Sequence, residues 1–178
     1  MSNLEEKQIS SEKLLSAKII NVRRDKVLSP KGECFREVVE HSGGVVILPY
    51  IDKDNIILIK QWRYAAGKEL IELPAGKLEP KEDPFECAKR ELTEETGYKA
   101  KNWNSLGYIY TSPGFCNEKL YLYKASDLEY SGTNFDEFET IENLITPIKK
   151  AYEMIVSGKI VDSKTICALC HAKIEDTL

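Results

Sequence analysis

Alternating apolar and polar residues predict two strands near the start of the chain. Residues 17–27 (AKIINVRRDKV) alternate in this way, and residues 33–40 resume the pattern after the turn-forming sequence SPKG at 29–32. A short turn between two such segments is typical of an antiparallel hairpin. Residues 1–14 are polar, and we expect them to be frayed or loosely attached. Residues 1–41 therefore predict a small antiparallel β subdomain that covers a neighbouring element or a second copy of the chain.

The pattern from residue 42 to residue 178 predicts an α/β sandwich. Residues 45–51 (VVILPYI) are apolar on both faces, which is typical of a buried strand, and residues 56–64 follow the turn at 52–55 as the second strand of a central hairpin. Further strands are expected at 69–78 (ending at Pro74), 103–112, 120–128 and 141–147. Apolar residues at helical spacing predict helices at 147–157 and from Ser163, which can cap the last one. Strands followed by helices on both sides favour a mixed β-sheet between helical layers.

The clearest helix of the sequence follows residue 83. Asp83 is suited to the N-cap, Pro84 to the first helical position, and Gly97 to the C-terminal stop. Four residues fall within one narrow arc that should face a core: Phe85, Ala88, Leu92 and Thr96.

Composition and charge narrow the class of protein. The 178 residues carry a net charge of −4, so nothing favours general attraction to nucleic acid or to an anionic membrane. No apolar run approaches the roughly 20 residues of a membrane span, and the first residues lack the apolar region of a signal peptide. Five scattered cysteines argue against a disulfide framework and for a reducing compartment, so we expect a cytoplasmic protein.

Acidic residues occupy an unfavourable position on the predicted helix. Glu91, Glu94 and Glu95 lie on the arc beside the apolar one, with Arg90 at its edge. They crowd the last turns, where each carboxylate opposes the helix dipole by about 0.3–1 kcal/mol. A solvated acidic face is the simplest alternative, but Glu91 and Glu95 are one turn apart, as two oxygen ligands of Mg²⁺ or Mn²⁺ should be. We therefore predict a divalent-cation site on this helix.

The segment from Gly76 to Tyr98 follows the spacing G-x5-E-x7-R-E-U-x-E-E-x-G-U, where U is a bulky apolar residue. This spacing resembles the signature of the Nudix hydrolases, with aromatic Tyr98 at a position that is more often aliphatic. The resemblance implies a Nudix-type α/β/α sandwich over residues 42–178. It also implies that Glu91 and Glu95 bind Mg²⁺ directly, that Glu94 serves as a further ligand or in catalysis, and that the carbonyl of Ala75 completes the site. Arg90, in the same catalytic set, could pair with Glu82 and hold the loop against the helix.

Three features outside this segment resemble the ADP-ribose pyrophosphatase subfamily. Pro113 and Gly114 lie in the loop SPGFCNE, where the subfamily has a proline, and Glu118 resembles an acidic residue that meets the terminal ribose. Arg63 is similar in placement to an arginine that contacts substrate. The alternatives are an ordinary turn proline and, for Arg63, a surface salt bridge.

The third feature is the acidic loop at 134–139 (NFDEFE), which resembles a mobile lid whose glutamate deprotonates the attacking water. Glu137 is the first choice for this general base and Glu139 the second. A solvated loop without a catalytic role remains the alternative.

Together these features predict Mg²⁺-dependent hydrolysis of ADP-ribose to AMP and ribose 5-phosphate by a homodimer. The alternative within the family is a nucleotide-sugar diphosphatase that acts on an ADP-sugar or GDP-mannose. A catalytically silent binding module is disfavoured because all the metal carboxylates are present. Hydrolysis of RNA caps or action on nucleic-acid chains is disfavoured, because the net charge is negative and the sequence has no basic stripe.

Overall fold

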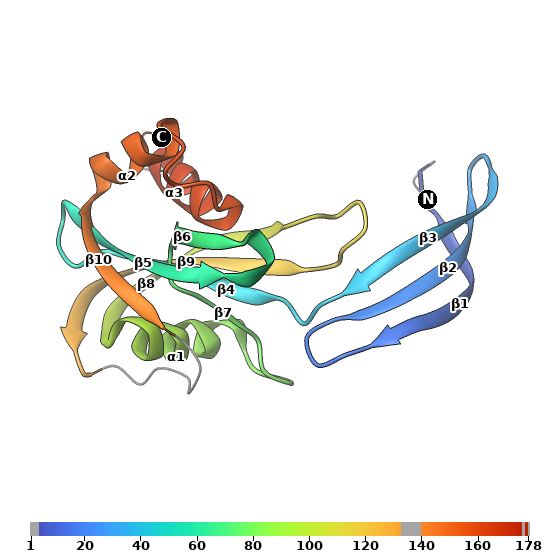
Figure 1. Ribbon diagram of the computed structural model, residues 1–178, viewed down its shortest axis with the longest axis horizontal. Coiled ribbons are helices and arrows are strands. Elements are labelled where there is room, and N and C mark those ends of the chain that lie inside the picture. The colour runs from blue at the N-terminus through green and yellow to red at the C-terminus, as the bar shows by residue number, and fades with distance from the viewer. Residues whose placement is uncertain (1–3, 133–139, 176, 178) are drawn as a thin grey trace. The chain divides into compact units, whose positions relative to one another are not determined.

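The computed structural model describes residues 4–132, 140–175 and 177 as two compact units (Figure 1). One unit comprises Met1–Gly43 and Tyr110–Lys119, and the other comprises Gly44–Ile109 and Leu120–Leu178. The strands are β1 (Lys7–Ser16), β2 (Asn21–Ser29), β3 (Gly32–Glu40), β4 (Gly44–Pro49), β5 (Asn55–Arg63), β6 (Lys68–Glu72), β7 (Ala75–Lys77), β8 (Tyr98–Tyr110), β9 (Lys119–Tyr130) and β10 (Ile141–Pro147). The helices are α1 (Pro84–Thr96), α2 (Ile148–Val156), α3 (Ser163–Glu175) and the short 3₁₀ helix η1 (Tyr64–Ala66). None of the described helices is long and apolar enough to cross a membrane.

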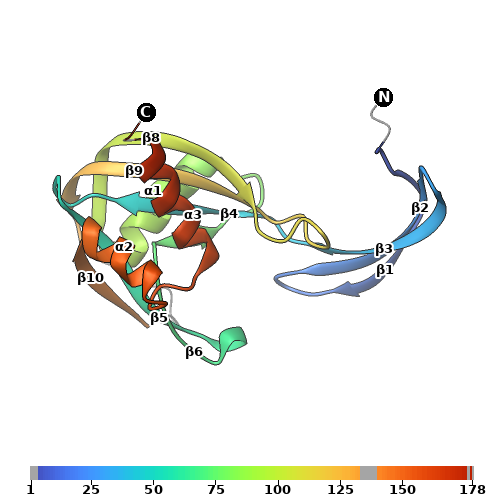
Figure 2. The ribbon, with the colours of Figure 1, turned by 90° about the horizontal axis from the view of Figure 1, so that it is seen from above.

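The N-terminal unit is an antiparallel sheet in the order β1-β2-β3, with its strands side by side in every view (Figure 2). The predicted hairpin is confirmed as β2 and β3, and the Ser29 hydroxyl donates to the Gly32 carbonyl at 2.8 Å across its turn. The expectation that residues 1–14 are frayed or loosely attached was wrong for residues 7–14, because β1 pairs with β2 from Lys7 onward. All ten β1 residues are exposed, so backbone hydrogen bonds define a strand that has no hydrophobic pattern to detect.

The second unit contains two sheets, in the orders β7-β4-β9-β8 and β10-β5-β6. β4 runs parallel to β9 and antiparallel to β7, so the first sheet is mixed. The predicted central hairpin was wrong: β4 and β5 belong to different sheets and meet at the isolated bridge between Tyr50 and Ile56. The reason is that β7 and β9 occupy both edges of the fully buried β4, which leaves no edge for β5.

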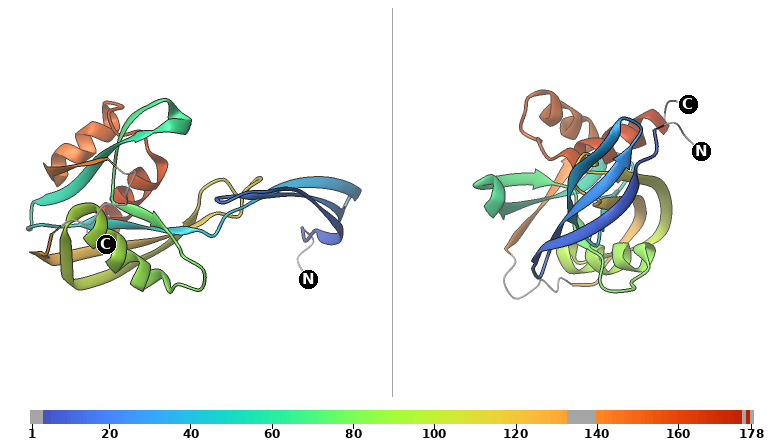
Figure 3. Two further views of the ribbon diagram at one scale, coloured as in Figure 1. Left: turned by 60° about the horizontal axis from the view of Figure 1, so that its bottom comes forward. Right: turned by 90° about the vertical axis from the view of Figure 1, so that its right-hand side faces the viewer.

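Alternate residues of β4 face two separate cores, which confirms the α/β/α sandwich. Val45 and Ile47 pack toward α1, whereas Val46 and Leu48 pack toward α2 and α3. Figure 1 and Figure 3 show α1 on one side of the sheets and α2 and α3 on the other. This arrangement makes α1 a rigid platform, because its apolar stripe is buried by a strand that is itself buried on both faces.

The ends of two helices depend on aspartate caps. Asp83 accepts hydrogen bonds from the amides of Phe85 (2.9 Å) and Glu86 (3.3 Å), and Gly97 ends α1 in the left-handed region at φ 78°, as predicted. At α3 the cap is Asp162, whose carboxylate accepts from the Thr165 amide at 3.0 Å. The expectation that Ser163 caps this helix was wrong by one position.

Candidate active site

The predicted metal ligands lie on the buried and half-buried faces of α1. Glu95 is only 3% exposed, and its Oε2 accepts a hydrogen bond from the Ala75 amide at 2.8 Å. The backbone of β7 is thereby fixed against the helix. The structure thus brings together Ala75 and Glu95, two of the predicted ligands, through the amide of Ala75.

Arg90 gathers three carboxylates. Its guanidinium donates to both oxygens of Glu82 (2.9 and 3.0 Å), as the sequence predicts, and its Nη1 donates to Glu91 (2.7 Å) and Glu94 (2.9 Å). The hydrogen bonds from Arg90 hold the pKa of Glu82 at about 2, and hydrogen bonding to Glu82 is the main cause of the raised pKa of Arg90. Arg90 therefore ties the loop before α1 to the carboxylates of the helix.

Gly76 lies directly against Glu91. A Cβ atom at residue 76 would lie 1.7 Å from the carboxyl carbon of Glu91 and 1.9 Å from one of its oxygens. Any larger residue would force this carboxylate or the β7 backbone to move. The glycine of the motif is required here by close approach of the backbone to a functional side chain.

The chemistry of this set fits a divalent cation. Glu91, Glu94 and Glu95 supply hard oxygen donors, and Glu91 and Glu94 share Arg90 with Glu82. Across the described part of the chain, no three His, Cys, Asp or Glu side chains already form a metal cage. Such a cage is not needed for Mg²⁺, which usually takes one or two protein carboxylates and completes its shell with water and substrate phosphates.

Arg63, predicted to contact substrate, forms a bidentate pair with Glu72. Its Nε and Nη2 donate to the two carboxylate oxygens at 2.8 and 2.6 Å. The pKa of Arg63 is raised, mainly by this hydrogen bonding and to a smaller extent by the charges of Glu72, Glu95 and Asp162. The side chain keeps 40% exposure, so the salt-bridge alternative and a role in substrate binding are compatible.

Sequence reasoning missed Glu72 and its second partner, Lys164. Glu72 is fully buried, and its Oε2 accepts from the Lys164 ammonium at 2.5 Å. Burial would raise the pKa of Glu72, but the hydrogen bonds and charges of Arg63 and Lys164 outweigh it and lower that pKa. A signal was present in the sequence, since a glutamate between Ile71 and Leu73 of an apolar segment requires a buried cation.

Pro113, Gly114 and Glu118 belong to the N-terminal unit. Pro113 and Gly114 line a pocket together with Arg36, Tyr110 and other residues of that unit. Glu118 accepts from the Thr111 hydroxyl at 2.8 Å and lies 3.2 Å from His41 Nδ1. Pro113 and Gly114, but not Glu118, therefore line a cavity of about 460 Å³ within this unit.

Glu137 and Glu139, the predicted general bases, lie outside the described residues. Their assignment stays a prediction.

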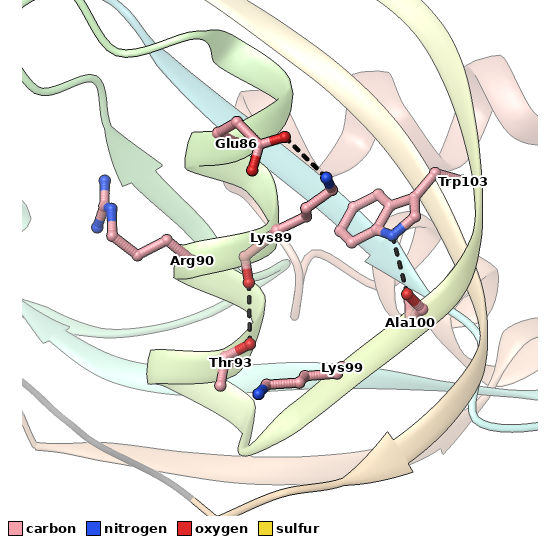
Figure 4. Close-up of a pocket in the computed structure, with 7 residues that line it drawn as sticks. All are labelled: Glu86, Lys89, Arg90, Thr93, Lys99, Ala100 and Trp103. Atoms are coloured by element: carbon pink, nitrogen blue, oxygen red, sulfur yellow. Dashed lines mark hydrogen bonds and ion pairs between the residues drawn. The ribbon is translucent and has the colours of Figure 1, made fainter.

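A second hollow lies on the outer side of α1 (Figure 4). It is lined by Glu86, Lys89, Arg90, Thr93, Lys99, Ala100 and Trp103. Lys89 pairs with Glu86 at 2.8 Å, and the Trp103 indole donates to the Ala100 carbonyl at 3.1 Å. The guanidinium of Arg90 points away from Trp103 in Figure 4 and binds Glu91 and Glu94, so Arg90 connects this hollow with the acidic platform, which consists of Glu91, Glu94 and Glu95.

Comparison with known families gives one matching domain model. The NUDIX domain model matches residues 40–163, which include β4, α1 and the buried Glu72. A solved structure described as an ADP compounds hydrolase superposes with a TM-score of 0.84 at 21% identity, covering 97% of this chain and 95% of the other. This structural likeness shows the fold.

Several curated proteins are similar over most of their length. An ADP-ribose pyrophosphatase of Bacillus subtilis is 36% identical over 100% of this chain and 98% of its own. A methanol dehydrogenase activator of Bacillus methanolicus is 35% identical over 98% and 96%. A GDP-mannose pyrophosphatase of Cronobacter sakazakii is 35% identical over 78% of each chain.

Proposed function

The chain belongs to the Nudix family and is a Nudix pyrophosphatase, and from this premise we propose that it hydrolyses ADP-ribose to AMP and ribose 5-phosphate with Mg²⁺. The observation that carries the proposal is the excess of carboxylates around Arg90, held against the Ala75–Gly76 backbone. Such a negative site suits a cation that in turn binds a pyrophosphate. Support for ADP-ribose comes from the full-length similarity to an ADP-ribose pyrophosphatase.

In this proposal Glu91 and Glu95 would hold Mg²⁺, or Mn²⁺ in its place, with Glu94 and the Ala75 carbonyl as further donors. When bound, the cation neutralises charge on the phosphate oxygens and lowers the pKa of water. Arg90 keeps Glu91 and Glu94 in position through its hydrogen bonds. The amide of Ala75 does the same for Glu95, so all three carboxylates are held in position.

Each predicted substrate residue keeps its expected role in this proposal. Arg63 attracts the pyrophosphate, Pro113 and Gly114 shape the loop around the sugar, and Glu118 accepts hydrogen bonds from the terminal ribose. Glu137 takes the proton of the attacking water, with Glu139 as the second candidate. The positive charge and 40% exposure of Arg63 support its part in the scheme.

The alternative substrate is another nucleotide sugar, such as an ADP-sugar or GDP-mannose. Similarity to a GDP-mannose pyrophosphatase supports this alternative over a shorter part of the chain. A catalytically silent binding module is disfavoured because Glu91, Glu94 and Glu95 are all present and gathered with Arg90 or Ala75.

We also propose that the enzyme is a cytoplasmic homodimer that joins through the sheet of β1, β2 and β3. Its exposed apolar side chains include Ile9, Leu14, Leu15 and Phe35, which a second copy would cover. The free cysteines agree with a reducing compartment. Sedimentation of the full chain should give twice the monomer mass, and Leu14→Glu should shift it toward the monomer.

One panel assay separates the candidate substrates. ADP-ribose, ADP-glucose and GDP-mannose are incubated with and without Mg²⁺, and a coupled phosphatase releases phosphate from the products. The proposal expects kcat/KM for ADP-ribose to exceed the other two values by at least about tenfold, and activity to vanish with chelator. Preference for GDP-mannose would establish the alternative, and no turnover of any compound would favour the silent module.

A further inference from the structure

Four charged side chains form a closed network at the start of α3. Glu72 accepts from Arg63 and Lys164, and Lys164 also pairs with Asp162 at 2.9 Å. Asp162 in turn accepts from the Thr165 hydroxyl at 2.6 Å. Two cations face two carboxylates, so the network is neutral as a whole. A buried glutamate is tolerated only with this kind of complete pairing.

The network is joined to the acidic platform by the segment from Glu72 to Ala75. The Leu73 amide donates to the Thr165 hydroxyl at 2.8 Å, and the Pro74 carbonyl accepts from the Ile47 amide at 2.9 Å. The Ala75 amide then donates to Glu95 at 2.8 Å. Each residue of this segment is therefore held by a hydrogen bond. A shift of Glu72 would move the Ala75 amide and, with it, the carboxylate of Glu95.

Arg63 retains hydrogen-bonding capacity despite its pairing with Glu72. Its bonds within the described part of the chain use Nε and Nη2, and they leave Nη1 available to an anion. Glu72 Oε2 accepts from both Arg63 Nη2 and Lys164, so the negative charge of Glu72 is shared between two cations. Without Lys164, the carboxylates of Glu72 and Asp162 would leave the network with a net negative charge, which would weaken the attraction of Arg63 for phosphate oxygens.

We infer that Lys164 is a positioning residue, which holds Glu72 and balances the charge of Asp162, so that Arg63 can attract an anionic pyrophosphate. The inference rests on the proposed function, in which Arg63 contacts the substrate. Lys164 itself acts through Glu72 and Arg63, because its ammonium is occupied by Glu72 and Asp162.

The first test replaces the charge of Lys164. Lys164→Met should raise KM for ADP-ribose about tenfold and change kcat by less than about threefold, because one net positive charge near the phosphate site is lost. Lys164→Arg should keep KM near the wild-type value. Lys159→Met removes an exposed lysine before α3 and serves as the control. An unchanged KM in folded Lys164→Met would overturn the inference.

A second variant separates charge from structure. Asp162→Asn keeps an N-cap side chain for α3 but removes one negative charge. In the double variant Lys164→Met with Asp162→Asn the network is neutral again, so KM should return to within about threefold of wild type. If Lys164 only stabilises the fold, the double variant should lose more thermal stability than Lys164→Met and show no recovery of KM.

A binding measurement makes the inference independent of turnover. Calorimetry with inorganic pyrophosphate and Mg²⁺ should give a Kd about tenfold weaker for Lys164→Met than for wild type. An equal Kd would overturn the role of Lys164 even if ADP-ribose is hydrolysed. A weaker Kd together with no hydrolysis of ADP-ribose would keep Lys164 and reject the proposed substrate.

Discussion

Arg90 and Glu72 stand at the centres of two charge clusters that differ in balance and burial. Arg90 is one cation among three carboxylates, with side chains that remain 13–30% exposed. Glu72 is fully buried between Arg63 and Lys164, and Asp162 completes a neutral set. In the first cluster three carboxylates share one arginine, whereas in the second two cations pair with two carboxylates.

This difference suggests that the Arg90 cluster binds a ligand and that the Glu72 cluster positions side chains. An excess of carboxylates at an accessible site calls for an external cation, while a balanced buried set fixes the geometry of its members. The two clusters are linked by the four residues from Glu72 to Ala75, whose amides and carbonyls are held at both ends. Variants that remove charge without removing hydrogen bonds test each cluster separately.

The largest loss of catalytic activity is expected from Glu95→Gln. A glutamine oxygen can still accept from the Ala75 amide, but the charge that binds the cation is lost. Metal-assisted stabilisation is worth several kcal/mol, so kcat/KM should fall on the order of 10³-fold with little change in melting temperature. Steady-state hydrolysis of ADP-ribose in Mg²⁺ and a thermal melt measure the two quantities.

The matched control for that variant is Glu86→Gln on the same helix. Glu86 is exposed and pairs with Lys89, on the outer side of α1 (Figure 4). Its replacement should change kcat/KM by less than about twofold, as is usual for surface pairs. Equal losses in both variants would indicate a general effect of helix charge and would remove Glu95 from the site.

A smaller loss is expected from Gly76→Ala. The new Cβ would lie 1.7 Å from the carboxyl carbon of Glu91, so the carboxylate must leave its place. A misplacement of about 1 Å can cost on the order of 10²-fold in rate, and kcat/KM should fall by that amount. A crystal structure of the variant should show Glu91 turned away from residue 76. Full activity would mean that the observed position of Glu91 is not the productive one.

The sequence predicted the acidic cluster because its members are close along one helix. Spacing of three and four residues, together with the Asp83 cap and the Gly97 stop, is enough to place Glu91 and Glu95 on one face. The Glu72 network was not predictable in this way, since Glu72 and Lys164 are 92 positions apart. Only the packing of α3 against β4 and β6 brings them together, and no local pattern encodes that contact.

Contacts between residues far apart in the sequence also explain the errors in the predicted fold. Alternation identified β2 and β3, and apolar runs identified β4 and β5, but neither pattern carried information on which edges pair, so β4 and β5 were wrongly joined. β1 was missed because all its side chains are exposed and only its backbone pairing defines it. Local signals thus sufficed for the helices and for strands with apolar residues facing a core, whereas strand partners depended on tertiary structure.

The structural role of the Glu72 network can be tested by the stability of a Thr165 variant. Thr165→Val keeps the shape of the side chain but leaves the buried Leu73 amide without its acceptor. The unfolding free energy should fall by about 1–3 kcal/mol, the cost of an unsatisfied buried donor. Urea unfolding of Thr165→Val and of Thr165→Ser, which keeps the hydroxyl, measures this cost. If Thr165→Val loses no more stability than Thr165→Ser, the hydroxyl contributes no more to stability than the methyl group that serine lacks.

The smallest effect is the loss of unfolding free energy expected from Glu82→Gln, and this loss should depend on pH. Arg90 lowers the pKa of Glu82 from 4.5 to about 2, so the ionised carboxylate stabilises the folded state above pH 4.5. Glutamine should cost about 1 kcal/mol at pH 7, because water screens this partly exposed pair. Since protonation of Glu82 removes the same interaction from the wild type, the difference between the two proteins should shrink from pH 4.5 to about 2. Urea unfolding at pH 7, 4 and 3 tests this trend, and a difference that stays constant would show that the charge of Glu82 contributes nothing to the attachment of the loop to α1.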